Sequence, residues 1–123
     1  SKLRQRDGSN GEEGRKKYAA LIADVFAAAA SRDPAVDFLV CGDFNCTPDS
    51  PPVTFDLGAT GDRSRVVPKA DKPQLLDLLA KKDPTQFGTL WYSGKPLIYD
   101  HICVSPGLLD HDGGVAVLGE EKL

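Results

Sequence analysis

The stretch that most constrains the fold is an apolar run that stops at a glycine and then turns polar. The run extends from Val36 to Cys41 and is followed directly by Gly42-Asp43-Phe44-Asn45. A nearly continuous apolar run of this length is typical of a β-strand that is covered on both faces. Asp and Asn favour turns, so the residues after it indicate a loop. The sequence therefore predicts a buried strand whose end presents an acid and an amide.

A helix is predicted before this strand. Between Arg15 and Ser31, apolar residues recur every three or four positions and alanines fill most of the others. Asp33-Pro34 ends the pattern, because a residue that precedes proline disfavours the helical conformation. Ser1 to Lys17 holds six basic and three acidic residues with interspersed glycines, which predicts a mobile basic loop. This loop is either a solvated tail or a strip that touches substrate phosphates.

The remainder of the chain predicts short elements separated by loops. Asp43 to Pro52 is rich in turn residues and proline, and the stretch from Thr60 to Lys72 is polar. The other expected elements are a short helix at Pro52–Leu57, a helix at Gln74–Lys82, strands at Thr89–Tyr92 and Leu97–Ser105 joined by Ser93-Gly94-Lys95-Pro96 in a hairpin, and a last strand at Val115–Leu118. This order predicts one α/β (α+β) domain over residues 1–123 with antiparallel pairs toward its end.

Composition sets wide limits on function. The 123 residues are 41% hydrophobic and 27% charged, which fits one ordinary domain. The net charge of -3 gives no global attraction for polyanions, so nucleic acid would have to bind through local patches or a metal ion. The longest apolar stretch, Tyr18 to Ala30, contains Asp24 and is too short to cross a bilayer. Three cysteines favour reduced thiols packed as small apolar groups and a reducing compartment such as the cytoplasm, and the polar amino terminus shows no signal peptide.

Two groups of residues are candidates for a functional site. Asp43 and Asn45 are either ordinary turn residues or half of a phosphate site, since alternate side chains in an extended turn point the same way and converge on one phosphate. Asp100 lies inside the otherwise apolar Leu97 to Val104. A buried carboxylate is costly unless a cation, a hydrogen-bonded histidine or a metal lies nearby, although a structural ion pair would also explain it.

Three other patterns point away from a site. His101 follows Asp100 directly and in a regular strand would point to the opposite face of the sheet, as a packed strand histidine. His111 lies between Asp110 and Asp112, but glycines and a proline around it indicate a surface turn. The alternating oxygens from Asp43 to Asp49 do not form a calcium loop, because Pro48 and Thr54 occupy the positions that need glycine and an acid.

The sequence resembles the endonuclease/exonuclease/phosphatase superfamily of metal-dependent phosphoesterases. The resemblance rests on Gly42-Asp43-Phe44-Asn45 with Pro48 and Ser50, and on Tyr99-Asp100-His101-Ile102 with Val104-Ser105. It implies part of a four-layer α/β sandwich with a mixed, largely antiparallel sheet. It also implies that Asp43 activates or positions the attacking water, that Asn45 holds the scissile phosphate, and that Asp100 orients a catalytic histidine. Mg²⁺ is the implied cofactor, with Mn²⁺ as a substitute and Asp43 and Asn45 as its ligands.

The sequence also departs from this family. The early metal-binding glutamate, the asparagine-histidine pair and the terminal serine-aspartate-histidine have no counterpart here. The resemblance therefore predicts the carboxyl-terminal part of the fold, an incomplete active site and an inert isolated chain. The alternative is a non-catalytic fragment or interaction module, whose exposed apolar sheet face favours self-association or a complementing chain. The substrate stays open among DNA, RNA, phospholipid head groups, inositol phosphates and nucleotides.

Overall fold

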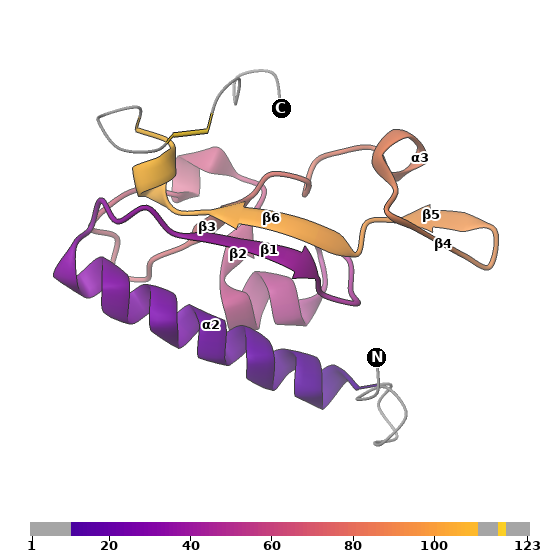
Figure 1. The fold of residues 1–123 in the computed structure, drawn as a ribbon, viewed down its shortest axis with the longest axis horizontal. Coiled ribbons are helices and arrows are strands. Elements are labelled where there is room, and N and C mark those ends of the chain that lie inside the picture. The colour runs from indigo at the N-terminus through magenta and orange to yellow at the C-terminus, as the bar shows by residue number, and fades with distance from the viewer. Residues whose placement is uncertain (1–10, 111–115, 118–123) are drawn as a thin grey trace.

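The structure is a computed structural model that describes residues 11–110 and 116–117, in which one long helix lies along one face of a small sheet (Figure 1). Its helices are α2 (Glu12–Arg32), η1 (Pro52–Leu57), η2 (Arg63–Arg65), α3 (Pro84–Phe87) and η3 (Pro106–Leu108). Its strands are β1 (Leu39–Asp43), β2 (Ala59–Thr60), β3 (Leu75–Asp77), β4 (Leu90–Tyr92), β5 (Lys95–Leu97) and β6 (Asp100–Val104). The α/β class is as predicted; the four-layer sandwich stays a prediction.

The main sheet has four described strands in the order β1-β6-β3-β2, and β4 pairs with β5 apart from it. β6 pairs antiparallel with β1 and with β3, whereas β2 and β3 run parallel. The sheet is therefore mixed. β1 is an edge strand of this sheet, and β6, which carries Asp100, lies directly beside it (Figure 1).

Each face of the sheet packs against its own apolar cluster. On the face that α2 and η1 cover, the cluster includes Phe26, Val53, Leu57, Leu75 and Cys103. On the opposite face a smaller cluster consists of Val66, Leu76, Val104, Leu108 and Leu109. The two clusters hold β3 and β6 between them, so the end of β6 that carries Asp100 extends from a rigid centre.

Helix α2 confirms the predicted helix and extends it toward the amino terminus. The helix begins at Glu12 after Gly11, whose φ of 80° places it in the left-handed region. The predicted mobile loop is thus wrong for residues 12–17, which are helical, and residues 1–10 lie outside the described part. At the other end the chain turns extended at Asp33, as the following proline requires.

The helix predicted at Gln74–Lys82 is wrong. Leu75 to Asp77 form strand β3, and the chain then turns until α3. Leu75 and Leu76 are buried on opposite faces of the sheet, in different clusters. A central strand that is buried on both faces shows no alternation of apolar and polar residues, so its run of leucines was read as a helical pattern.

Strand β1 is less covered than predicted. It begins at Leu39 rather than Val36, and Leu39 is 56% exposed although Val40 packs against the α2 cluster. The prediction of cover on both faces is wrong here, because among the described residues packing covers β1 only on its α2 face.

The predicted hairpin forms, with a tighter turn. Ser93 and Gly94 alone connect β4 and β5, with φ of 51° and 76°. Positive φ at both positions is typical of a two-residue type I′ turn. The predicted strand Leu97–Ser105 is interrupted at Ile98 and Tyr99. Leu97 is the last residue of β5, and β6 begins at Asp100.

Three further expectations have clear outcomes. The short helix at Pro52–Leu57 is confirmed with the same bounds. Of the strand predicted at Val115–Leu118, only residues 116–117 are described, and they are not in a strand. None of the helices within the described ranges has the length and hydropathy to span a bilayer.

The three cysteines are free thiols, with Cys46 and Cys103 buried and Cys41 exposed on β1. Burial raises the pKa of both Cys46 and Cys103, so they behave as inert apolar groups. The predicted packing is therefore confirmed for two of the three.

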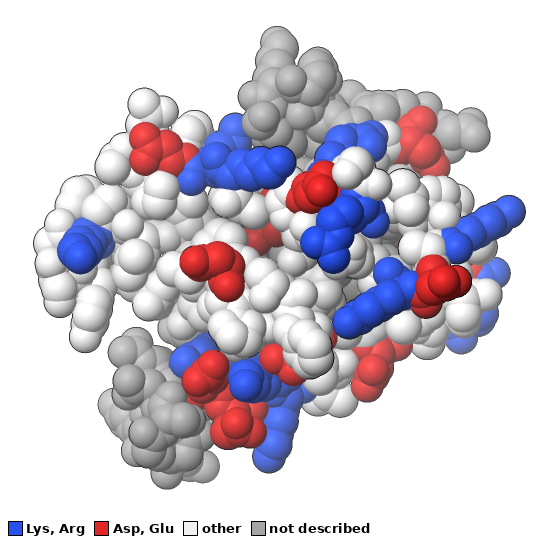
Figure 2. Space-filling model, turned by 180° about the vertical axis from the view of Figure 1, so that it is seen from behind, with Lys and Arg blue, Asp and Glu red and all other residues white. Residues whose placement is uncertain are grey.

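Charge is unevenly distributed along the chain. The stretch from Thr60 to Lys82 has six basic and three acidic residues, although the whole chain carries -3. On the face opposite to that of Figure 1, Lys and Arg side chains spread over the upper and right-hand parts among fewer acidic ones (Figure 2). A local surface of this kind attracts anions even on an acidic protein.

Candidate active site

The turn after β1 fixes the geometry of Asp43 and Asn45. Gly42 has a φ of 153°, which a side chain rarely tolerates, and Asn45 has a φ of 55° in the left-handed region. The backbone N–H of Asn45 donates to Oδ1 of Asp43 over 2.9 Å. Asparagine is among the residues that tolerate this conformation, and aspartate commonly accepts such a bond. Turn chemistry thus explains both residue types and holds one oxygen of Asp43 in place.

Strand pairing brings Asp100 to Asp43. The β1–β6 register pairs Asp43 directly with Asp100, and just beyond this pair the N–H of Phe44 donates to the carbonyl of Tyr99 over 2.8 Å. Directly opposed residues on antiparallel strands have Cβ atoms about 4.5–5.5 Å apart on the same face. Two like charges so placed repel each other, which a bound cation would relieve.

The hydroxyl of Thr89 fixes the start of β6. Its Oγ1 accepts the backbone N–H of Tyr99 over 2.9 Å and that of Asp100 over 3.1 Å. Its own N–H donates to the carbonyl of Leu97, so the residue joins the β4–β5 hairpin to the strand that carries Asp100. Sequence reasoning assigned Thr89 to a strand and missed this role, for which the sequence gives no local signal.

Asp43 and Asn45 line one cavity. It has a volume of about 400 Å³ and lies between the first half of α2 and β1, with Arg15 and Tyr18 on the helix side. Asp100 does not line this cavity, although it pairs with Asp43. The three predicted residues thus gather at one end of the β1–β6 ladder, with Asp43 common to the cavity and to the pair of acids.

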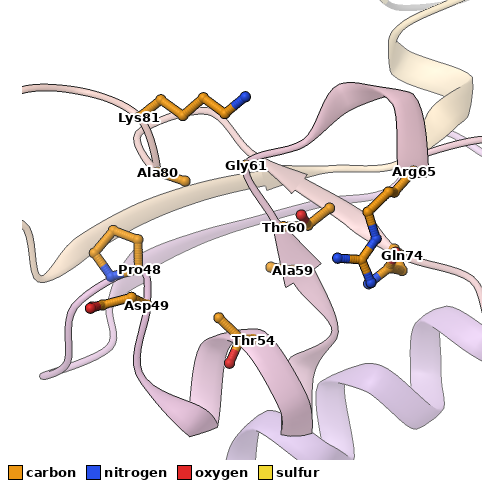
Figure 3. Close-up of a pocket in the computed structure, with 10 residues that line it drawn as sticks. All are labelled: Pro48, Asp49, Thr54, Ala59, Thr60, Gly61, Arg65, Gln74, Ala80 and Lys81. Carbon is orange, nitrogen blue, oxygen red and sulfur yellow. The ribbon is translucent and has the colours of Figure 1, made fainter.

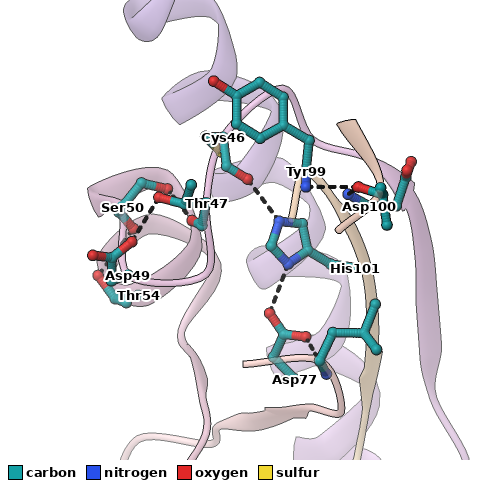
Figure 4. Close-up of polar contacts among 11 residues, drawn as sticks. Cys46, Thr47, Asp49, Ser50, Thr54, Asp77, Tyr99, Asp100 and His101 are labelled. Carbon is teal, nitrogen blue, oxygen red and sulfur yellow. Dashed lines mark hydrogen bonds and ion pairs between the residues drawn. The ribbon is translucent and has the colours of Figure 1, made fainter. Parts of the chain in front are cut away.

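His101 is a buried, fully bonded strand histidine, as predicted. The residue is 1% exposed, and Figure 4 shows its ring between Asp77 and Cys46. Nε2 lies 2.7 Å from the carbonyl oxygen of Cys46, so Nε2 donates. Nδ1 lies 2.7 Å from Oδ2 of Asp77, and one proton is held between these two atoms. We call this chain of contacts the Asp77–His101–Cys46 relay.

The relay supports the turn that carries Asp43 and Asn45. Asp77 is 3% exposed, and its Oδ1 accepts the N–H of Leu79 over 3.0 Å. The ring of His101 packs against Phe44 at 5.0 Å between ring centroids. Sequence reasoning missed Asp77, because strand β3 was predicted as a helix and the partner of Asp77 is 24 residues away.

The relay also determines the protonation of His101. Burial of the ring acts to lower the pKa of His101, but the hydrogen bonds to Asp77 and Cys46 and the negative charges of Asp77 and Asp100 outweigh it. The pKa of His101 is therefore raised above its ordinary value of about 6.5. A raised folded-state pKa contributes stability that is complete below the unfolded pKa and is lost as the pH rises through the folded one.

The variant Asp77→Asn tests this relay. We expect it to lower the free energy of unfolding by about 3–5 kcal/mol near pH 6, because it removes one partner of a buried charged pair. The loss relative to the parent chain should shrink as the pH rises above about 6.5. Urea unfolding from pH 6 to pH 9 measures it, with Asp24→Asn on the exposed side of α2 as the control. A loss that stays constant over this range would contradict the shared proton.

The described residues include no group of three or more His, Cys, Asp or Glu side chains placed to hold a metal ion. His111 lies outside them. The oxygens of Asp43, Asn45 and Asp100 remain the donors that suit a hard cation, since Mg²⁺ prefers carboxylate and amide oxygens and retains several waters.

Comparison with known proteins identifies the family. The model of the endonuclease/exonuclease/phosphatase family matches residues 9–120, which is most of the chain. No curated protein and no solved structure gives a significant match. Members of the matched family are metal-dependent phosphoesterases, and the pair of motifs around Asp43 and Asp100 falls within the matched range. On this match, the chain belongs to the endonuclease/exonuclease/phosphatase family.

Proposed function

We propose that Asp43, Asn45 and Asp100 form part of the active site of a metal-dependent phosphate-ester hydrolase. The observation that carries this proposal is the direct pairing of Asp43 with Asp100 at the end of the β1–β6 ladder, with Asn45 in the adjoining turn. Family membership supports the class of reaction. The reacting group is a phosphate ester, and nucleic acid is one of the substrates that this chemistry admits.

Each of the three side chains has a proposed role that follows from its chemistry. Asp43 and Asn45 would hold Mg²⁺ or Mn²⁺, which takes up negative charge on the phosphoryl oxygens, and Asp100 adds a second negative charge beside them. Oδ1 of Asp43 is engaged by the turn, which leaves Oδ2 to position the attacking water. The amide of Asn45 donates to an oxygen of the scissile phosphate.

Asp100 is proposed to orient a catalytic histidine. His101 does not serve as that histidine, because both of its ring nitrogens are engaged on the other face of the sheet. The family's terminal histidine motif has no counterpart in the 123 residues. We therefore propose that the active site is incomplete in this chain and that the chain alone has little or no turnover.

Metal binding is testable without turnover. Substoichiometric Mn²⁺ should broaden the amide NMR signals of residues 42–45 and 99–101, because a paramagnetic ion there relaxes nearby nuclei. The double variant Asp43→Asn/Asp100→Asn should abolish this local broadening, whereas Asp24→Asn should preserve it. Broadening of equal strength at exposed acids elsewhere, such as Asp62, would count against a specific site.

Turnover tests the reaction and the incompleteness separately. With Mg²⁺ and either bis(p-nitrophenyl) phosphate or p-nitrophenyl phosphate, we expect the chain to hydrolyse no more than its Asp43→Ala variant does. Magnesium-dependent hydrolysis that Asp43→Ala abolishes would overturn the proposed incompleteness and establish the enzyme. Failure of a longer protein with the missing motifs to hydrolyse any phosphate ester would remove the hydrolase proposal.

A non-catalytic interaction module is the second proposed function, and exposed apolar side chains favour it. Tyr18, Leu21 and Val25 form a stripe along α2 and are 59–60% exposed. Tyr18 also lines the cavity beside β1, so the stripe continues onto that strand, whose outer edge pairs with no other described strand. An edge strand with unpaired backbone groups and adjoining apolar surface is suited to pairing with another chain. We propose a second copy of this chain as that partner.

Sedimentation tests the self-association. The parent chain should show a concentration-dependent dimer, and Leu21→Glu/Val25→Glu should shift it toward monomer, because charges on the stripe oppose its burial. A charge-matched variant, Ala27→Glu/Ser31→Glu, adds the same two charges at exposed positions of α2 that lie off the stripe, and should leave the dimer intact. A monomer at every concentration would refute the proposal.

A further inference from the structure

A second cavity lies apart from the candidate site and differs from it in character. Its volume is about 280 Å³, and Figure 3 shows it between η1, strand β2 and the turn at Ala80 and Lys81. Residues that differ in chemistry line it: Arg65 and Lys81 supply positive charge, and Thr60 and Gln74 supply hydrogen-bond donors. None of Asp43, Asn45 and Asp100 is among its lining residues.

The two cations lack a carboxylate partner in the described part of the chain, where neither Arg65 nor Lys81 forms an ion pair. Asp62 is within electrostatic range of both: two hydrogen bonds from Ser64 lower the pKa of Asp62 most, and the positive charges of Lys81 and Arg65 lower it further. Asp62 does not line the cavity. Its Oδ1 accepts both the N–H and the hydroxyl of Ser64, at 3.1 and 2.7 Å.

The neighbouring residues position the cationic groups. Gly61 leaves room for the stem of Lys81, since a Cβ at Gly61 would lie 3.3 Å from Cγ of Lys81 and 2.9 Å from Cβ of Ala80. In Figure 3 the guanidinium of Arg65 points toward Gln74, and Lys81 lies across the cavity from it, beside Ala80 and Gly61. A planar guanidinium that binds two oxygens and a compact ammonium are together suited to a tetrahedral oxyanion.

The hydroxyl of Thr60 is poised to donate. Its Oγ1 accepts the N–H of Asp62 over 3.0 Å, so its own hydrogen is left for another acceptor. Asp49, the one acid in the lining, repels a bound anion less than its charge alone would suggest. Its Oδ1 accepts the hydroxyl of Thr47 over 2.6 Å, and Figure 3 shows its carboxylate directed away from Arg65 and Lys81.

We propose that this cavity binds a phosphate group through Arg65, Lys81 and the hydroxyl of Thr60. The surrounding stretch from Thr60 to Lys82 has twice as many basic as acidic residues, which would draw an anion to the cavity from solution. The site needs no metal and does not depend on hydrolysis at Asp43. It therefore adds a second phosphate-binding position to a protein whose own reaction class already concerns phosphate.

Titration of the full 123-residue chain tests the proposal. At pH 7.5 and constant ionic strength, inorganic phosphate should shift the amide NMR signals of Thr60, Gly61, Arg65 and Lys81 in a saturable way. Arg65→Gln/Lys81→Gln should weaken binding at least tenfold. The matched control, Lys69→Gln/Lys72→Gln, removes the same charge from the same basic stretch but from residues outside the cavity, and should change the affinity less than twofold.

The outcomes distinguish a phosphate ester from free phosphate as the ligand, and a specific site from general electrostatic attraction. Adenosine 5′-monophosphate that binds more tightly than phosphate at the same residues would identify a phosphate ester as the ligand, whereas tighter binding of inorganic phosphate would identify the free anion. Equal weakening in both double variants would overturn the site in favour of general attraction. Absence of saturable shifts at these residues would also overturn it, without bearing on Mn²⁺ binding at Asp43.

Discussion

The Asp77–His101–Cys46 relay is the interaction on which the position of the candidate site depends. Three segments that are far apart in the sequence meet in it: the end of β3, strand β6 and the turn after β1. Because the ring of His101 bonds at both nitrogens, it cannot rotate without the loss of a buried hydrogen bond. The turn that carries Asn45 is held from the protein interior, while Asp43 and Asp100 lie on the opposite face of the same sheet. At this end of the sheet, the face of His101 thus supports the turn and the other face carries the paired acids.

Strand register explains why this division works. His101 and Asp100 are neighbours in β6, so their side chains point to opposite faces. A shift of the ladder by one residue would bury the acid and expose the histidine. The packing of β3 and β6 between two apolar clusters fixes the register, because Cys103 and Val104 occupy different clusters.

Local patterns in the sequence were enough to predict part of this arrangement. The helical spacing before Asp33 and the turn residues after Cys41 each have a local physical cause, and each was interpreted correctly at the level of structure. Asp100 lies in a strand as predicted, but it is half-buried rather than buried. Strand β3 was not recognised, since its leucines face both clusters and a strand buried on both sides has no two-residue period. Asp77 and Thr89 were missed because their roles exist only through partners 24 and 10–11 residues away. The chemical roles of Asp43, Asn45 and Asp100 stay predictions.

The opposed acids at the last rung of the β1–β6 ladder have a mechanical consequence. The hydrogen bond from Phe44 to Tyr99 lies just beyond two opposed carboxylates, so we expect this end of the ladder to open first at low ionic strength, where the repulsion between them is least screened. A cation that settles between the acids would draw the strand ends together, and local order at the mouth of the site would then rise with ion occupancy. Binding of the ion would thus stabilise the pairing of β1 and β6 at this end.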